Sequence, residues 1–151
     1  MKIAIGGDHA GFPLKGTVIR ILRSWNHDVK DCGSFNPEPV DFPDIAMIVC
    51  DEIKSGRAER GMMVCGTGVG ASIAGNKIHG IRAAVCHDTY SARQCVEHDD
   101  VNLLCLGAQI IGPSLAEEIL AAFLKARFST EEQFRRRVRK LNELDMLVPK
   151  P

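Results

Sequence analysis

The stretch from Met62 to Ser72 limits the folds open to this chain more than any other segment does. It starts as an apolar run, continues as a turn that contains Gly66, Gly68 and Gly70, and ends in residues of helical composition. Glycines let a backbone come close to a ligand, and the first amides of a helix have no partner within the helix. The stretch therefore predicts a buried strand, a glycine-rich turn and a helix start that together form an anion site.

Cys65 stands at the end of this expected strand, directly before the turn. Backbone amides at a helix start favour a thiolate over a thiol, which makes Cys65 a candidate base or nucleophile. The alternative is a packed core cysteine, since glycine-rich turns are common in α/β proteins and cysteine is often buried. The turn is not a P-loop, because no Gly-Lys-Ser/Thr follows, and it lacks the glycine spacing of a dinucleotide-binding fingerprint.

Apolar and amphipathic segments alternate along the whole chain. This alternation predicts parallel strands joined by right-handed helical crossovers, and the apolar strands predict a sheet covered on both faces. We expect a single domain over residues 1–151, a Rossmann-like α/β/α sandwich with about five parallel strands. Ile48 and Leu115 fall on helix faces that we expect to be buried. The expected strands are 3–7, 28–33, 62–65, 81–86 and 102–107, and the expected helices are 13–25, 44–55, 71–77, 89–97, 114–127 and one from about 129.

Composition narrows the class of protein further. The 19 basic and 19 acidic residues balance, so no global field favours nucleic acid or a membrane surface. No apolar segment is long enough to span a membrane, and a strand begins at Lys2 with no signal peptide ahead of it, so we expect a cytoplasmic protein. The six cysteines form no CxxC pairs, and we expect all except Cys65 to be core thiols rather than disulfides or zinc ligands.

Polar residues follow three of the expected strands, where ligands bind in open parallel sheets beside a topological switch point. Asp8 and His9 end the first strand and could grip hydroxyl groups or move protons; the alternative is that Asp8 only caps the next helix. His87 follows the fourth strand, and its role stays open. His98 near the end of a helix is, taken alone, typical of a surface residue favoured by the helix dipole.

The basic run from Arg135 to Lys140 is mostly a solvated helix face, with one exception. Arg137 lies about 50° from the centre of an apolar stripe at about 100° per residue, so it can flank a packed interface and reach an anion. A thiol base, an acid/base histidine and an anion-binding arginine suit proton transfer next to a carbonyl, and no cluster has metal-ligand spacing. The stripe consists of Phe134, Val138, Leu141 and Leu144.

These stretches resemble the ribose-5-phosphate isomerase B family, which is related to the galactose-6-phosphate isomerase subunits. The resemblance covers nearly the whole chain in order, and the combination of Asp-His with Cys-Gly-Thr-Gly-Val-Gly is highly specific. The matching segments are IAIGGDHAGFPLK (3–15), VDFPD (40–44), CGTGVGASIAGNK (65–77), GIRAAVCHDTYSAR (80–93) and EHDDVNLLCLGAQIIG (97–112).

The resemblance implies an isomerase, free of cofactor and metal, that interconverts ribose 5-phosphate and ribulose 5-phosphate through a cis-enediolate. It implies that Cys65 moves the proton between C2 and C1. The amides of residues 66–70 with Thr67 would hold the enediolate oxygen as an anion hole. The loop residues carried over in this way are Gly66, Gly68, Val69 and Gly70.

The resemblance also assigns roles outside the loop. His98 would assist opening of the furanose ring, Asp8 would contact the ring oxygens, and His9 and Arg137 would bind phosphate. The family is dimeric, in some members tetrameric, and builds each site across the subunit interface. The final helix is therefore expected to pack on a partner subunit.

Four departures from the family pattern put the substrate in doubt. Gln133-Phe134 replaces an Arg-His pair, Gln109 replaces an arginine, Asp99 replaces an asparagine after the ring-opening histidine, and Phe42 replaces a tyrosine. Fewer charge-assisted contacts should weaken phosphate binding, and a carboxylate would repel phosphate. Asp99 remains a candidate substrate contact, and Gln109, Gln133 and Ser72 are weaker candidates.

Several functions are therefore open. The substrate could be another aldose phosphate, such as allose 6-phosphate, galactose 6-phosphate or a tetrose phosphate. A non-catalytic phosphosugar-binding protein with the same fold would bind ligand without needing the thiol of Cys65. A thiol-dependent hydrolase or redox enzyme would instead use Cys65 as a nucleophile and form a trappable covalent intermediate.

Overall fold

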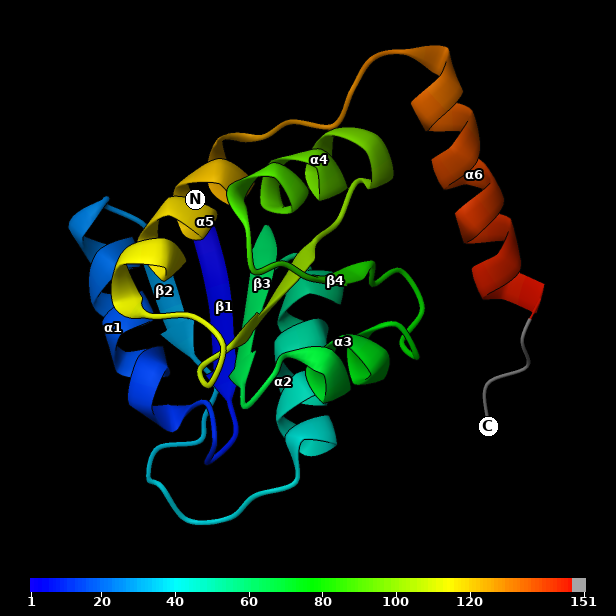
Figure 1. Cartoon of the computed structure of the whole chain (residues 1–151). Coiled ribbons are helices and arrows are strands. Elements are labelled where there is room, and N and C mark those ends of the chain that lie inside the picture. The colour runs from blue at the N-terminus through cyan, green and yellow to red at the C-terminus, as the bar shows by residue number, and fades with distance from the viewer. Residues whose placement is uncertain (148–151) are drawn as a thin grey trace.

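The computed structural model describes residues 1–147 and contains a parallel sheet in the order β2-β1-β3-β5-β4 (Figure 1). The predicted sheet of about five parallel strands is confirmed. The strands are β1 (Lys2–Gly7), β2 (Asp28–Asp31), β3 (Arg60–Cys65), β4 (Ala83–Val85) and β5 (Leu103–Gly107). The helices are α1 (Phe12–Ser24), α2 (Phe42–Lys54), α3 (Val69–Gly75), α4 (Thr89–Asp99), α5 (Pro113–Lys125) and α6 (Glu132–Leu147).

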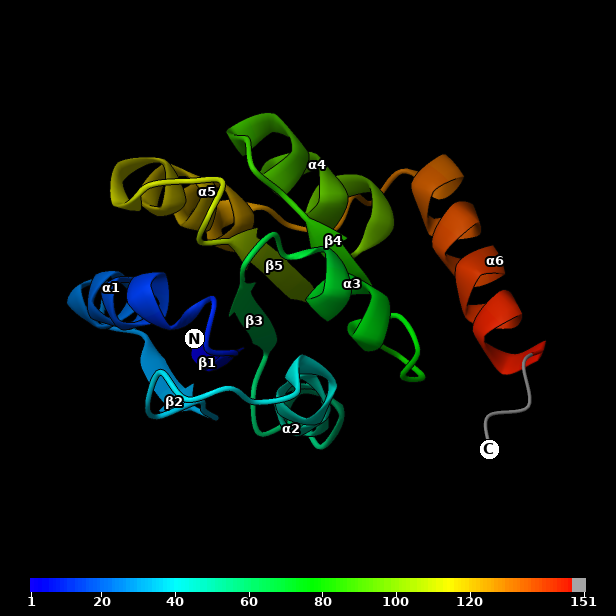
Figure 2. The ribbon, with the colours of Figure 1, turned by 60° about the horizontal axis from the view of Figure 1, so that its bottom comes forward.

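Helices cover both faces of the sheet, which is the predicted three-layer sandwich (Figure 2). Helices α1, α4 and α5 pack on one face, and α2 and α3 pack on the other. Successive strand residues point to opposite faces, so Met62 and Val64 of β3 lie in the first core while Met63 and Cys65 lie in the second. The sulfur of Cys65 therefore faces the α2–α3 side of the sheet.

The strand order places a topological switch point between β1 and β3. From β1 the chain moves outward to β2, and it then returns to add β3 on the other side of β1. Gly7 is in register with Val64, so the residues that follow β1 lie beside the end of β3. Helices α1 and α3, which follow these two strands, pack on opposite faces of the sheet, so the loops after the strands bound the crevice in which such sheets bind ligands.

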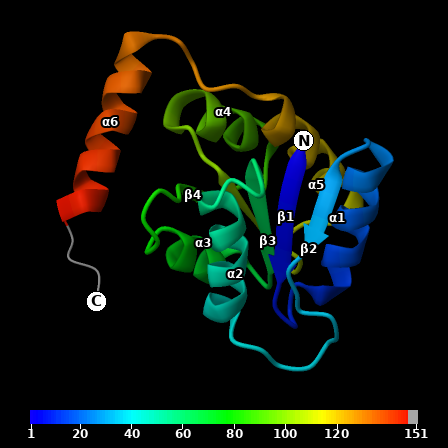
Figure 3. The same ribbon diagram turned by 180° about the vertical axis from the view of Figure 1, so that it is seen from behind.

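Helix α6 stands beside the β4 edge, apart from the three layers (Figures 1 and 3). A hollow of about 500 Å³ lies between α6 and this edge, lined by residues that include Lys77, Arg82 and Leu144. Val138 is the buried residue of α6, whereas Leu141 and Leu144 are 44% and 58% exposed. The second half of the apolar stripe predicted for this helix, Leu141 and Leu144, thus has no cover within the described part of the chain.

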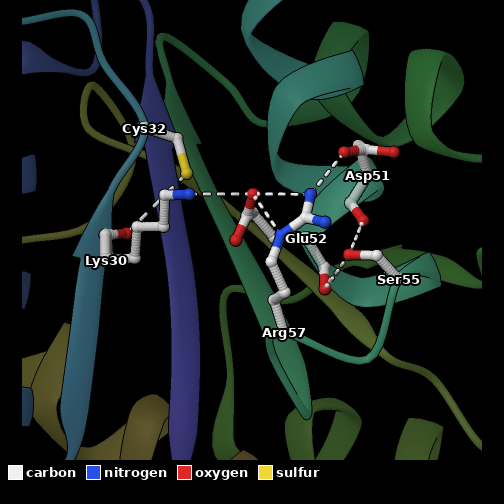
Figure 4. A network of polar contacts seen from close by, with 6 residues as sticks. All are labelled: Lys30, Cys32, Asp51, Glu52, Ser55 and Arg57. Carbon is white, nitrogen blue, oxygen red and sulfur yellow. Dashed lines mark hydrogen bonds and ion pairs between the residues drawn. The ribbon is translucent and has the colours of Figure 1, made fainter.

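Ion pairs hold the amino edge of the sheet (Figure 4). Glu52 near the end of α2 is only 5% exposed and pairs with Arg57 at 3.0 Å and with Lys30 of β2 at 2.9 Å. Arg57 also binds Asp51 at 2.6 Å. The Arg57 hydrogen bond, followed by that of Lys30, holds the pKa of Glu52 below its usual range. The network joins α2 to β2 and to the turn that leads into β3.

Two predicted core residues are wrong. Ile48 is 47% exposed and Leu115 is 38% exposed. In α2 the buried face passes through Ala46, Val49 and Cys50, whose small side chains allow close approach to the sheet, and Ile48 lies well off that face. In α5 the buried face is centred on residues 116, 119, 120 and 123, one position past the predicted stripe. Helix α2 also begins at Phe42 rather than near Asp44.

Candidate functional site

Cys65 and Asp8 come together at the switch point, at the ends of adjacent strands. Gly11, in the turn after Asp8, packs so closely on β3 that an added Cβ would lie 1.8 Å from the carbonyl oxygen of Val64. Ala10 of the same turn faces Gly66, with its Cβ 3.5 Å from where a Gly66 Cβ would stand. The predicted pairing of the first and third strand ends is therefore realised in the fold.

The thiol of Cys65 is 5% exposed and receives a backbone hydrogen bond from the glycine-rich turn. The N–H of Gly68 donates to Sγ at 3.1 Å. Gly68 has φ +81°, and an added Cβ would stand 3.2–3.3 Å from the backbone of Cys105 and Leu106. Only glycine adopts this positive φ and fits this narrow space without strain. The resulting turn directs an amide dipole at the sulfur, where it stabilises negative charge.

The turn after β5 anchors the glycine-rich loop. Ala108 donates its N–H to the carbonyl of Cys65 at 2.8 Å, and Gln109 donates to that of Gly66 at 3.0 Å. The side chain of Gln109 also lies against Gly66, because an added Cβ there would be 3.3 Å from Oε1. Thr67 is exposed at the tip, and its Oγ1 accepts a long hydrogen bond of 3.4 Å from Val69. The loop is thus fixed at its base and open at its tip.

Phe42 closes the other side of the loop. An added Cβ on Gly70 would meet the Phe42 ring at 2.8 Å, so the ring rests directly on this glycine. Val69 beside it is 51% exposed. The predicted loop residues 66–70 therefore form one continuous rim at the carboxyl end of β3.

Asp8 is 7% exposed and fixes its own turn. Its Oδ1 accepts the N–H of Gly11 at 2.8 Å, but α1 has Gly11 as its N-cap and no side-chain cap, so Asp8 fixes the turn rather than capping the helix. His9 is exposed, and its Nδ1 accepts the N–H of Val40 at 3.4 Å. That contact ties the loop between β2 and α2 to the site. The carboxylate and the imidazole thus stand at the same edge as Cys65.

The remaining cysteines pack in the core, as predicted. Burial raises the pKa of Cys50 to about 11, and it raises the pKa of Cys105 well above its ordinary value. Cys86 donates a hydrogen bond to Cys95, which raises the pKa of Cys86 and lowers that of Cys95. All six cysteines are free thiols. Cys65 differs from the rest because it alone ends a strand at the glycine-rich turn.

His98 and Arg137 lie at the opposite edge of the sheet from Cys65. Helix α4 starts beside the strand ends and carries His98 about 13 Å along its axis from Thr89. Asp100 then binds Arg82 at the start of β4, which marks the amino edge. The imidazole of His98 stacks on the Phe134 ring with centroids 3.9 Å apart, and the Arg137 guanidinium lies over the same ring at 5.6 Å. One chain therefore presents two separate clusters.

The other predicted site residues lie on α3, α4 and α6. Asp99 is exposed at the end of α4, next to His98. Gln133 is exposed on α6 and donates a hydrogen bond to Glu131 at 2.8 Å. Ser72 directs its hydroxyl to the carbonyl of Ala83 at 3.3 Å, away from the glycine-rich loop.

His87, whose role the sequence left open, belongs to the carboxyl edge. Its Nε2 accepts the N–H of Gly107 at 3.1 Å, so the ring proton is on Nδ1. Gly107 is the register partner of Cys65, and His87 thereby supports the strand that borders the thiol. The only signal in the sequence was its place directly after an expected strand.

Residues 1–147 contain neither a metal-binding cluster nor a membrane-spanning helix. No group of three or more His, Cys, Asp or Glu side chains is placed to hold a metal ion. No helix in this range combines the length and the apolar character needed to cross a membrane.

Comparison with known proteins identifies the family. The family model described as Ribose/Galactose Isomerase matches residues 3–141. The chain belongs to the ribose/galactose isomerase family. Ribose-5-P isomerase B of Listeria innocua is 47% identical over 129 residues, which cover 85% of this chain and 87% of the relative. The D-erythrulose-4-phosphate isomerase of Pectobacterium atrosepticum is 44% identical, covering 85% of each chain.

A solved structure of the ribose/galactose isomerase family has the same fold. Ribose-5-phosphate isomerase B of Clostridium thermocellum superposes with a TM-score of 0.94 at 44% identity, covering 97% of this chain and 98% of that one. The resemblance inferred from the motifs is therefore confirmed, and the chain is a sugar-phosphate isomerase by family. The family places no limit on which sugar phosphate is used, since relatives of nearly equal identity carry the names of different substrates.

Proposed function

We propose that this protein interconverts ribose 5-phosphate and ribulose 5-phosphate through a cis-enediolate, with Cys65 as the base. The observation that carries the proposal is the N–H of Gly68 aimed at Sγ of Cys65 at 3.1 Å, at the switch point of the sheet. A thiolate held there would take the proton from C2 and return it to C1, while the negative charge moves to the carbonyl oxygen on C1 and the hydroxyl proton on O2 passes to that oxygen. No bond to sulfur forms, so the thiol is regenerated in each cycle.

The rim of the loop supplies the second requirement of this reaction. Amides of residues 66–70 and the hydroxyl of Thr67, which is exposed, would receive the enediolate oxygen as its charge develops. One preorganised donor of this kind lowers the barrier by about 3–4 kcal/mol. Asp8 and His9 would contact the sugar oxygens and the phosphate from the neighbouring strand end.

The site is completed, in this proposal, by a second copy of the chain. His98 and Arg137 cannot reach Cys65 of their own chain, since they stand at the opposite edge of the sheet. Helix α6 leaves Leu141 and Leu144 exposed, and α3 leaves Val69 and Ile73 exposed by 51% and 57%. A homodimer that buries these apolar residues would bring His98 and Arg137 of one subunit to Cys65 of the other. His98 would then assist ring opening and Arg137 would bind the phosphate.

A tetrose phosphate is the main alternative substrate. It is favoured by the 44% identity to an enzyme named D-erythrulose-4-phosphate isomerase and by Gln109, whose neutral amide lies against Gly66. Allose 6-phosphate and galactose 6-phosphate are longer, and nothing in the site favours them.

Initial-rate assays across four-, five- and six-carbon aldose phosphates test the proposal. We expect the highest kcat/KM with ribose 5-phosphate and incorporation of solvent deuterium at C2. Turnover confined to the tetrose phosphate would reject ribose 5-phosphate as the substrate, but it would be consistent with isomerisation through an enediolate. A protein that binds these sugars equally well after Cys65→Ala, and isomerises none of them, would be a non-catalytic binder. A covalent adduct with substrate would instead indicate a thiol-dependent hydrolase or redox enzyme.

A further inference from the structure

We propose that Phe134 is a positioning residue, which sets the orientation of both His98 and Arg137; this rests on the proposed function. The Phe134 ring stacks on the imidazole of His98 with centroids 3.9 Å apart and an angle of 13° between the planes. The guanidinium of Arg137 lies over the same ring at 5.6 Å. A single side chain thus contacts the ring-opening histidine and the anion-binding arginine.

The surroundings of α6 leave this task to Phe134. The start of α6 is tied to the end of α4 by the N–H of Ser129, which donates to the carbonyl of Glu97 at 2.9 Å. Farther along α6, only Val138 is buried in the described part of the chain. The far end of α6 is held on the loop before β4 by Asp145, which accepts the N–H of Gly80 at 2.8 Å and pairs with His79 at 3.2 Å. At the start of the helix, the stacked pair is the side-chain contact through which α6 and His98 can set each other's position.

Arg137 is the cation of α6 that shares an aromatic partner with His98. Arg139 pairs with Glu132, and Arg135 lies over the ring of Phe128 at 5.2 Å. A cation over an aromatic face is restrained without an ion pair, so its positive charge stays available to an anion. Phe134 therefore presents Arg137 instead of neutralising it.

An apolar partner also suits the chemistry assigned to His98. Phenylalanine restrains the plane of the imidazole but cannot exchange hydrogen bonds with its nitrogens. Over residues 1–147, neither ring nitrogen of His98 makes a hydrogen bond within the chain. The stack thus fixes the ring while leaving both nitrogens for a sugar oxygen and for solvent.

Three variants separate positioning from simple packing. Phe134→Leu keeps an apolar side chain but removes the aromatic face. Phe134→Tyr keeps the aromatic face and should therefore behave like the wild type. Phe128→Leu is the matched control. It also removes an aromatic ring near the start of α6, but the face of that ring lies against Arg135 and not against His98. His98→Asn assigns the His98 signals and removes the group that Phe134 is proposed to position.

Proton NMR of the imidazole C–H signals tests the stack without reference to catalysis. With five histidines in the chain, the spectrum is simple to assign. We expect the His98 signals to be shifted upfield by the ring current of Phe134 in the wild type, in Phe134→Tyr and in Phe128→Leu. In Phe134→Leu they should move to the position of an unstacked histidine. His98 signals unchanged in Phe134→Leu would overturn the proposal.

Steady-state kinetics then test the role. In Phe134→Leu we expect kcat with ribose 5-phosphate to fall by about 10- to 100-fold, as for a catalytic group displaced by about 1 Å, and Phe134→Tyr to restore it. Erythrose 4-phosphate cannot close a furanose ring, because its O4 carries the phosphate, so with it KM should rise while kcat holds. Wild-type kinetics in Phe134→Leu, alongside a His98→Asn enzyme that fails on ribose 5-phosphate, would reject this inference and leave the proposed function intact. A His98→Asn enzyme with full activity would reject the proposed role of His98, and this inference with it.

Discussion

At the carboxyl edge of the sheet the functional groups are fixed by backbone amides, whereas at the amino edge they are fixed by other side chains. Cys65 receives the N–H of Gly68, and Asp8 receives the N–H of Gly11. His98 and Arg137 both lie against the ring of Phe134. The first arrangement follows from turns that directly continue two strands, and the second requires two helices to be placed correctly.

This difference has a physical consequence for the reaction. A proton moved between adjacent carbons tolerates little displacement of the base, and a strand end with a fixed turn gives little displacement. In the proposed reaction the phosphate lies at the far end of the substrate from C1 and C2, where side chains on a separate helix of another subunit would meet it. The following predictions each act on one of the two edges, in order of decreasing effect.

Cys65→Ser should cause the largest loss. An alcohol is a far weaker base than a thiol at neutral pH, so we expect kcat to fall by about 10³-fold, within the range for loss of a general base. The circular dichroism spectrum and melting temperature should change little, because the substitution is nearly isosteric. Cys95→Ser is the matched control: its hydroxyl can keep the contact to the Ala92 carbonyl, and its activity should stay at the wild-type level. Comparable losses in both variants would remove Cys65 from its role as base.

His98→Asn should reduce turnover of a cyclic sugar more than that of an open one. We expect about a 100-fold loss of kcat/KM with ribose 5-phosphate, because general acid–base assistance to ring opening is removed. With erythrose 4-phosphate, which cannot form a furanose, the loss should be small. Parallel assays of both sugars decide the matter, and equal losses would contradict a ring-opening role.

Gly11→Ala should disturb the carboxyl edge through packing alone. The added Cβ would stand 1.8 Å from the Val64 carbonyl oxygen, so the turn that bears Asp8 must move. We expect the free energy of unfolding to fall by about 3 kcal/mol, at the upper end of overpacking effects, and activity to fall with it. Gly16→Ala, within α1, is the control, because its added Cβ would meet nothing closer than 3.8 Å. It should instead raise the free energy of unfolding by about 0.5–1 kcal/mol. Urea denaturation measures both, and equal effects would contradict the close packing of the turn.

Glu52→Gln should have the smallest effect, and that effect should depend on pH. Arg57 and Lys30 lower the pKa of Glu52 in the folded protein, so the unfolded chain binds the proton more readily. The stabilisation by this network is present above the usual glutamate range, near pH 4.3, and is lost as pH falls through the lower folded pKa. The melting temperatures of wild type and variant should therefore differ at pH 7 and converge in acid. Glu132→Gln, at an exposed pair with Arg139, should show a smaller difference.

The sequence predicted most of the sheet and of the turns that directly follow its strands. Apolar runs and turn residues follow from local chemistry, so the parallel sheet, its two covers and the polar groups at its carboxyl edge could all be inferred. The inward faces of α2 and α5 were partly wrong, because small residues such as Ala46 and Cys50 determined which side could approach the sheet. Helical periodicity records which residues are apolar but not which neighbour comes closest.

The amino edge could not be derived from periodicity. The stacking of Phe134 on His98 joins two helices that are distant in the sequence, and no local pattern encodes that contact. Phe134 was visible only as a member of an apolar stripe and as a departure from the family pattern. The support that His87 gives to Gly107 was likewise hidden, since only the fold places β4 beside β5.

Subunit complementation tests most directly whether the two edges form one site. Cys65→Ser and His98→Asn subunits, each inactive with ribose 5-phosphate, are mixed in equal amounts, unfolded and refolded together. If each site takes Cys65 from one subunit and His98 from the other, half of the dimers are mixed, and one of their two sites is intact. We therefore predict recovery of about one quarter of the wild-type activity. Refolded mixtures that contain mixed dimers but have no activity above the two parents would contradict the account.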